Sequence, residues 1–220
     1  GAKSLAILNQ NYDVWVWDYT SGACTYYPLP DKSGADFHLS YNDAGDRLAI
    51  GTGTSDASIQ ILYQDSLLSL GRGLSAVKSL KFIPGTNLLL SGHANGSLIV
   101  WDGASGSVLR QINNAQPQIC ISSRATQVLT TDKKTIRLRS LATLMVTDSL
   151  SVGDRVIITA EIDSLTGMIA VGYENGDIGM WANGFRSKEI LCKGHTSKVN
   201  HLRWIRDNSN PSKPILVSCS

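Results

Sequence analysis

The sequence lacks long apolar runs and has little excess charge of either sign. Its apolar stretches are only a few residues long, whereas a helix needs about 20 apolar residues to cross a bilayer. Lys and Arg together number 20 against 18 for Asp and Glu, a formal net charge of +2, so no bulk field attracts nucleic acid or anionic lipid. We therefore expect no membrane insertion, and we expect any partner to be recognised by a local surface.

Cysteine is also scarce, and no secretory leader is visible. The 220 residues contain four cysteines and no CxxC pair, a usage that favours reduced thiols over a disulfide framework. The first residues, Gly1 to Ser4, lead into strand-like sequence without the apolar run of a signal peptide. The cysteine usage predicts an intracellular protein, cytoplasmic or nuclear, whose targeting signal is not visible in this sequence.

The motifs of common catalytic and cofactor sites are missing as well. The chain contains no GxSxG nucleophile turn, no HExxH zinc motif and no glycine loop spaced to wrap a phosphate. Its histidines, His38, His93, His195 and His201, are not grouped with cysteines or carboxylates in a metal-ligand pattern. We therefore expect no enzymatic activity, no cofactor and no metal.

What the sequence does contain is an internal repeat. A short apolar strand that closes on Trp occurs at residues 13–17, 97–101 and 177–181, and weaker copies occur at 58–63 and 135–139. Taking 17, 63, 101, 139 and 181 as the closing positions, neighbouring copies lie 38 to 46 residues apart. A period of this length is typical of repeat architectures in which each unit buries its faces against its neighbours.

Each unit reads as four short strands without helical periodicity. The clearest copy has strands at 77–82, 88–92, 97–102 and 108–112. Asn95-Gly96, like Asn175-Gly176, predicts a two-residue hairpin turn with positive φ at both central residues. Because the strands at 88–90 and 98–101 are continuously apolar, both faces of the sheet need cover. Radial stacking of such sheets around an axis supplies that cover.

These motifs resemble the WD-repeat β-propeller family. The resemblance rests on Trp17-Asp18, Trp101-Asp102 and Gly194-His195 and on their spacing. It implies an all-β fold of four-stranded antiparallel blades, in which a His, a Ser or Thr, an Asp and a Trp often form one hydrogen-bonded network within a blade. His195 and Ser218 match the first two members, and Trp17, Trp101 and Trp181 are expected to be buried structural residues.

Counting strands along the chain predicts its domain organisation. About 21 strands are expected: three in the first unit, four complete units, and two in the last. We predict a single propeller segment over residues 1–220, with about four complete blades (approximately 35–192) and partial blades at both ends. This is an incomplete segment of a ring of roughly seven blades.

The resemblance implies a non-enzymatic docking platform within a larger multidomain protein or complex, including a regulatory or sensor region of a signalling assembly. Its partners would be other proteins or other domains of the parent chain. Loops on rigid scaffolds commonly carry recognition, so the crossings from the fourth strand of one blade to the first of the next are the candidate surface. The candidate partner-binding residues there are Arg72, Gln116, Asp154, Arg155 and Lys198.

A basic cluster supports an alternative. Lys133, Lys134, Arg137 and Arg139 lie within seven residues, and strand alternation places the two arginines on one face. This pattern suits an RNA-binding propeller of a ribonucleoprotein or ribosome-assembly complex, since Arg presents a planar fork to phosphate. The competing interpretation is that the arginines cover apolar surface with their stems and point to solvent. Trp15 shares a face with Trp17, which favours packing between blades over an interface role.

Overall fold

The computed structural model describes residues 4–9, 13–28, 37–53, 57–113, 120–124, 126–182, 184–206, 210 and 213–220. Within these ranges the chain forms 21 β-strands, the number expected from the repeat. They build six sheets of three, four, four, four, four and two strands, and neighbours in each sheet are consecutive in sequence. No helix in the described part is long and apolar enough to cross a membrane.

The strands follow the predicted meander closely. The first sheet contains β1 (Ser4–Leu8), β2 (Asp13–Asp18) and β3 (Cys24–Pro28). The second contains β4 (Phe37–Tyr41), β5 (Arg47–Thr52), β6 (Ala57–Tyr63) and β7 (Ser66–Leu74). The third contains β8 (Val77–Phe82), β9 (Leu88–His93), β10 (Leu98–Asp102) and β11 (Val108–Ile112).

The remaining sheets repeat this order. The fourth contains β12 (Cys120–Arg124), β13 (Gln127–Thr131), β14 (Thr135–Ser140) and β15 (Val146–Ser151). The fifth contains β16 (Ile157–Ile162), β17 (Ile169–Tyr173), β18 (Ile178–Trp181) and β19 (Ile190–Cys192), and the last contains β20 (His201–Arg206) and β21 (Pro214–Cys219). Every pairing within a sheet is antiparallel.

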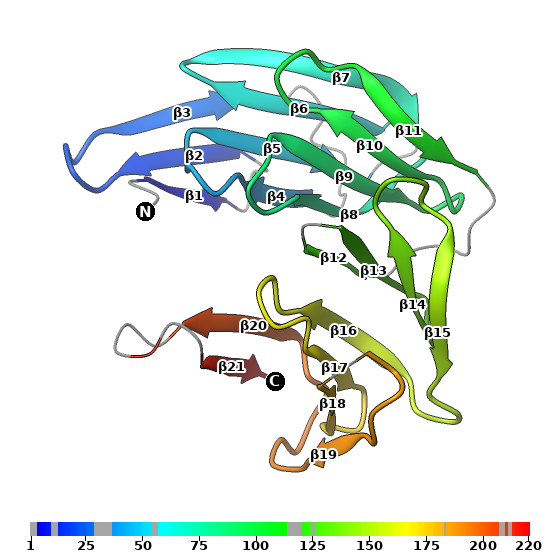
Figure 1. The fold of residues 1–220 in the computed structure, drawn as a ribbon. Coiled ribbons are helices and arrows are strands. Elements are labelled where there is room, and N and C mark those ends of the chain that lie inside the picture. The colour runs from blue at the N-terminus through cyan, green and yellow to red at the C-terminus, as the bar shows by residue number, and fades with distance from the viewer. Residues whose placement is uncertain are drawn as a thin grey trace.

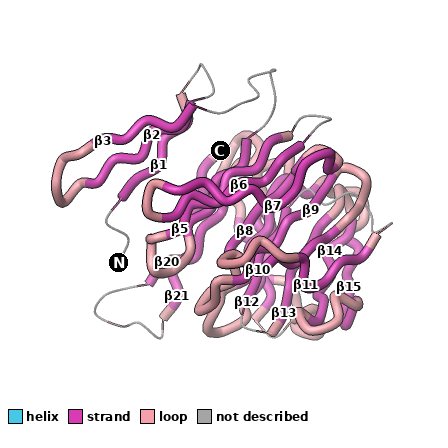
Figure 2. The backbone as a smooth tube through the Cα atoms, turned by 90° about the horizontal axis from the view of Figure 1, so that it is seen from above, coloured by secondary structure: helices cyan, strands magenta, loops and turns pink. Residues whose placement is uncertain are grey.

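The six sheets stand side by side in an open arc (Figure 1). The first strands of successive sheets, β4, β8, β12, β16 and β20, contact one another along the inside of the arc. The first sheet, β1–β3, and the last, β20–β21, form its two ends and do not pair with each other. Figure 2 shows the same sheets from above, with strands throughout and loops only at their ends.

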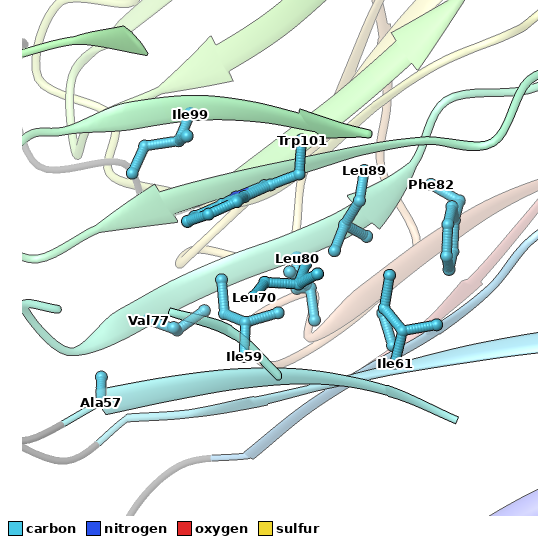
Figure 3. Close-up of a cluster of buried hydrophobic side chains, with 11 residues drawn as sticks. Ala57, Ile59, Ile61, Leu70, Val77, Leu80, Phe82, Leu89, Ile99 and Trp101 are labelled. Carbon is cyan, nitrogen blue, oxygen red and sulfur yellow. The ribbon is translucent and has the colours of Figure 1, made fainter. Parts of the chain in front are cut away.

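Among the described residues, five apolar clusters form the core, one at each junction between neighbouring sheets. Figure 3 shows the junction between β4–β7 and β8–β11, where Ile59 and Ile61 face Leu80, Leu89 and Trp101. β9 and β10 are buried on both faces, because residues on the other side of β10, such as Leu98, enter the next cluster. The continuous apolar runs are explained by this two-sided burial.

The hairpin turns differ from the prediction. Gly96 has φ 81° and Gly176 has φ 88°, whereas neither preceding asparagine has positive φ. In the first of these turns His93 N bonds Ser97 O and Gly96 N bonds His93 O. Three residues rather than two therefore form the loop, as in a type I turn closed by a left-handed glycine. Only the glycine needs the left-handed conformation.

The register also corrects one closing position. Trp101 pairs with Leu89, which pairs with Phe82 on the first strand of that sheet. In the second sheet the corresponding residue is Leu62, because it pairs with Leu48, which pairs with Tyr41. Tyr63 lies one position later, and the Arg47 guanidinium stacks on its ring at 3.9 Å.

The expected burial of three tryptophans holds for two of them. Trp101 and Trp181 are 3% and 2% exposed, whereas Trp17 is 45% exposed. On β2 the alternate residues Val14 and Val16 pack against the second sheet. Trp17 and Trp15 therefore point to the opposite side of β1–β3, which no described residue covers. The prediction that Trp17 is buried is wrong for the chain described.

Candidate functional site

A chain of hydrogen bonds ties Trp101 to the start of its own sheet. The indole Nε1 donates to Ser91 Oγ at 2.8 Å, and Ser91 Oγ lies 2.9 Å from His93 Nε2. His93 Nδ1 lies 2.8 Å from the backbone oxygen of Ser75. Because a carbonyl oxygen only accepts, Nδ1 carries the proton and Nε2 accepts from the Ser91 hydroxyl. The neutral imidazole thus satisfies every member of this buried network.

The histidine of this network comes from an unexpected position. The Gly-His pattern directs attention to the segment before the first strand, where His195 Nε2 lies 2.8 Å from Ser218 Oγ. In the third sheet that segment has no histidine, and His93 at the end of β9 reaches Ser75 from the hairpin side. Sequence reasoning missed His93; the available signal was a histidine two residues after the second-strand serine.

Acid is expected to weaken this part of the fold. Burial lowers the pKa of His93 below its usual 6.5, despite the bond to Ser75. The unfolded chain therefore binds a proton at this histidine at a higher pH than the folded protein does. The stability that the neutral imidazole provides above about pH 6.5 is lost as the pH falls below that value. We expect the thermal midpoint to drop between about pH 7.5 and about pH 5.5, and His93→Gln to be less stable at neutral pH but less sensitive to acid. An equal acid sensitivity in His93→Gln would contradict this role.

Arg139 occupies the tryptophan position of the fourth sheet. It pairs with Val128 as Trp101 pairs with Leu89. Its side chain is buried, with Nε donating to Thr130 Oγ1 at 3.1 Å and an Nη atom donating to Leu144 O at 3.0 Å. Burial, followed by the charge of Arg137, lowers the pKa of this guanidinium. Arg139 thus donates to Thr130 where Trp101 donates to Ser91.

The exposed basic patch therefore contains fewer residues than the sequence predicted. Arg139 faces the interior, which contradicts both the phosphate-binding and the solvent-facing interpretation of this residue. Arg137 is partly buried and bonds Asp132 at 2.7 Å. Only Lys133 and Lys134, in the turn between β13 and β14, are exposed.

Arg155 is held by its own sheet. Its guanidinium bonds both carboxylate oxygens of Glu189, at 2.6 and 2.9 Å, and lies 4.3 Å from the centre of the Tyr173 ring. The Tyr173 hydroxyl donates to the same carboxylate at 3.2 Å. Burial, followed by the negative charge of Glu189, raises the pKa of Tyr173. Tyr173 ends β17 as His93 ends β9, so this cluster replaces the imidazole network of the third sheet.

The loops at one end of the strands form a continuous surface, here called the rim. It comprises residues 132–135, 152–157, 173–177 and 195–199. Backbone bonds connect each loop to the next: Val152 N to Lys134 O, Glu174 N to Val156 O, and Val199 N to Tyr173 O, at 3.0, 2.9 and 3.1 Å. The rim is therefore a surface held in place by the fold.

Five charged side chains of the rim are exposed: Lys133, Lys134, Asp154, Glu174 and Lys198. Within the described residues none of them has a side-chain partner. A pocket of about 400 Å³ opens in the middle of the rim, lined by Val152, Asp154, Arg155, Val156, Glu174 and Asn175. The structure thus brings the lysines of the basic cluster beside Asp154 and Arg155, which the sequence had assigned to a different hypothesis.

The other predicted partner-binding residues are less defined. Arg72 lies on β7, but its side chain falls outside the described part, and Gln116 lies wholly outside it. Among the residues that the structure describes, no three His, Cys, Asp or Glu side chains group as metal ligands.

Comparison with known proteins agrees with this geometry. Residues 66–102 match the family model described as WD domain, G-beta repeat. The matched segment covers β7 to β10, that is, the fourth strand of one sheet and the first three of the next. This segment is similar to a WD40 repeat. The match includes Ser91, His93 and Trp101, the residues of the buried network.

A solved structure shows the same fold over nearly the whole chain. The computationally designed Ika8 protein is similar with a TM-score of 0.75 and 21% sequence identity. The similarity covers 99% of this chain and 65% of Ika8, so this chain spans about two thirds of the length of that protein. The comparison with curated proteins gave no match. The predicted WD-repeat-like, all-β propeller architecture is confirmed, with a ring that these residues do not close.

Proposed function

We propose that this chain is a non-catalytic platform that binds other proteins through the rim, as part of a larger multidomain protein or complex. WD40 repeats generally serve as protein-interaction scaffolds, and the proposal extends this general role to a named surface. The observation that carries it is the set of five exposed rim charges without an intramolecular partner, on loops joined by backbone hydrogen bonds.

The charge distribution defines the kind of partner. Lys133, Lys134 and Lys198 are positive, and Asp154 and Glu174, which line the central pocket, are negative. Such an arrangement suits a protein surface of mixed charge and does not suit a uniformly anionic polymer. The Arg155 guanidinium already bonds both Glu189 oxygens. Arg155 therefore helps to shape the surface and does not offer a partner a free hydrogen-bond donor.

Charge reversal on the rim tests this function. We expect the triple variant Lys133→Glu, Lys134→Glu, Lys198→Glu to recover at least about tenfold less partner from cell extract, a change of about 1.4 kcal/mol in binding free energy. Stability should change little, since exposed substitutions without partners usually alter unfolding by only about 0.5 kcal/mol. Quantitative affinity enrichment measures the first effect and thermal denaturation the second.

Two lysines at the other end of the strands provide the control. Lys188 precedes β19 and Lys213 precedes β21, so both lie on the turns opposite the rim, and both are exposed. Reversal at these positions should leave partner recovery unchanged. Equal losses from the two variants, or no loss from either, would refute rim binding.

RNA binding has less support from the geometry. With Arg139 buried and Arg137 bonded to Asp132, the cluster offers two exposed lysines beside Asp154. We expect labelled single-stranded RNA to bind the 220-residue protein weakly, with a shallow dependence on salt.

A further inference from the structure

A pocket of about 440 Å³ lies between the fourth and fifth sheets, at the end of the strands opposite the rim. Its lining residues come from the β12–β13 hairpin, from β14 and β15, and from the turns that follow β16 and β18. Its volume lies within the range of roughly 300–1,000 Å³ that is typical of small-molecule sites. The pocket shares no residue with the rim, so its occupancy is independent of protein binding there.

Three side chains of the pocket carry N–H donors that the fold does not use: Arg124, Gln127 and Arg186. Within the described part of the chain, no hydrogen bond or ion pair joins these donors to another residue. The two threonine hydroxyls of the pocket differ in this respect, because Thr147 donates to Leu138 O at 3.2 Å and Thr166 donates to its own turn. The free donors are therefore two guanidinium groups and one amide.

Arg124 occupies a position that serves the turn in other sheets. By strand register it corresponds to Asn42 in the second sheet and to Asp163 in the fifth. Asn42 Oδ1 accepts two backbone amides of its turn, both at 3.1 Å, and Asp163 accepts one at 2.7 Å. Because arginine has no acceptor, Arg124 cannot close its turn in this way, and its donors remain available to the pocket.

Gly167 makes room for the Arg124 guanidinium. This glycine lies in the turn between β16 and β17 with φ 73°, and a Cβ atom there would overlap Nη1 of Arg124. A side chain at this position would therefore displace the guanidinium, in addition to straining the backbone. A glycine of the fifth sheet thus determines where an arginine of the fourth sheet lies.

The charges of the pocket favour an anion. Arg124 and Arg186 supply two positive charges, and Asp148 supplies the one negative charge among the lining residues. We propose that this pocket binds the phosphate group of a small phosphate monoester, with Arg124, Gln127 and Arg186 as the donors. Phosphate offers several strong acceptor oxygens, and the planar fork of a guanidinium matches two of them at a time.

An NMR titration of the ¹⁵N-labelled 220-residue protein tests the proposal. Inorganic phosphate and glycerol phosphate are added separately, with sodium chloride at matched ionic strength as the reference. We expect the backbone amide signals of Gln127 and Gly167 to shift and to saturate within about 10 mM of either ligand. Glycerol phosphate should bind at least as tightly as inorganic phosphate, because the pocket has room for the body of a small molecule.

Three results of this titration would overturn the proposal. The first is the absence of saturable shifts with either phosphate compound. The second is equally tight binding of acetate, which would mean that the pocket does not select phosphate. The third is at least about tenfold tighter binding of a phosphoserine tripeptide than of glycerol phosphate, because the ligand would then be a phosphorylated protein segment.

Substitutions of the donors assign the binding to this pocket. Arg124→Gln and Arg186→Gln should each weaken phosphate binding at least about tenfold, since each removes charged hydrogen-bond donors. Gly167→Ala should also weaken it, although it removes no donor, because it displaces Arg124. The matched control is Lys213→Gln, which removes one exposed positive charge from the same end of the strands. An equal loss in this control would refute the assignment.

Asp148→Asn gives a change in the opposite direction. Removing this carboxylate charge from the pocket should strengthen phosphate binding about two- to threefold, because a like charge no longer repels the ligand. A gain of affinity cannot arise from a loss of folded protein, so this variant separates binding from stability. Unchanged affinity in both Asp148→Asn and Arg124→Gln would place the phosphate elsewhere and overturn the proposal.

Discussion

Trp101→Ala is expected to destabilise the protein by about 3–5 kcal/mol, the usual cost of truncating a fully buried tryptophan. Trp101 is 3% exposed and contributes to the apolar junction between the second and third sheets. Its loss also removes the donor to Ser91, although the serine keeps its bond to His93. Chemical denaturation of the purified protein gives the difference in unfolding free energy.

Trp17→Ala is the internal comparison, because Trp17 has the same register in its own sheet. At 45% exposure it should cost less than about 1 kcal/mol in the 220-residue chain. Equal costs for the two substitutions would mean that Trp17 is covered in this chain, contrary to the structure. A small cost for Trp101→Ala would remove its assignment as a core residue.

Arg139→Ala is the second substitution with a large expected effect, a loss of about 3 kcal/mol. It leaves a cavity and two buried acceptors, Thr130 Oγ1 and Leu144 O, without their donor, and an unsatisfied buried polar group costs about 1–3 kcal/mol. A surface arginine with its charge in solvent would lose about 0.5 kcal/mol or less. Denaturant unfolding distinguishes the two cases.

Arg139→Trp removes the charge at this position but keeps a large side chain with an N–H donor. A tryptophan at this register can donate its indole N–H to Thr130 as Trp101 donates to Ser91, so we expect it to retain stability to within about 1 kcal/mol of the parent. If Arg139→Trp is as unstable as Arg139→Ala, the equivalence of the two positions is wrong.

The fold was predictable from the sequence because local signals agreed with one another. Apolar strands, Gly-containing turns and a repeat spacing of 38 to 46 residues all favoured the same four-stranded unit, and the strand at 77–82 was placed correctly to the residue. Trp17 shows the limit of this reasoning. A tryptophan in a strand indicates that one face of its sheet is apolar. Whether the tryptophan is buried depends on a neighbouring sheet, which the strand sequence does not show.

The site was less predictable because the role of a charged side chain depends on the residues that it contacts. From the sequence, Arg139 and Arg155 were expected to be free donors. Arg139 instead donates within the core, and Arg155 bonds Glu189, which lies 34 residues away along the chain. Lys133 and Asp154 belonged to separate hypotheses until backbone bonds placed their loops side by side. Long-range pairing of this kind leaves no local signature.

Cross-linking mass spectrometry in cell extract tests the central claim, protein binding at the rim, most directly. An amine-reactive reagent samples Lys133, Lys134 and Lys198 on the rim and Lys188 and Lys213 on the opposite turns, all of them exposed. We predict that links to another protein concentrate on the three rim lysines. Intermolecular links that fall equally on both ends, or only on Lys188 and Lys213, would contradict the account.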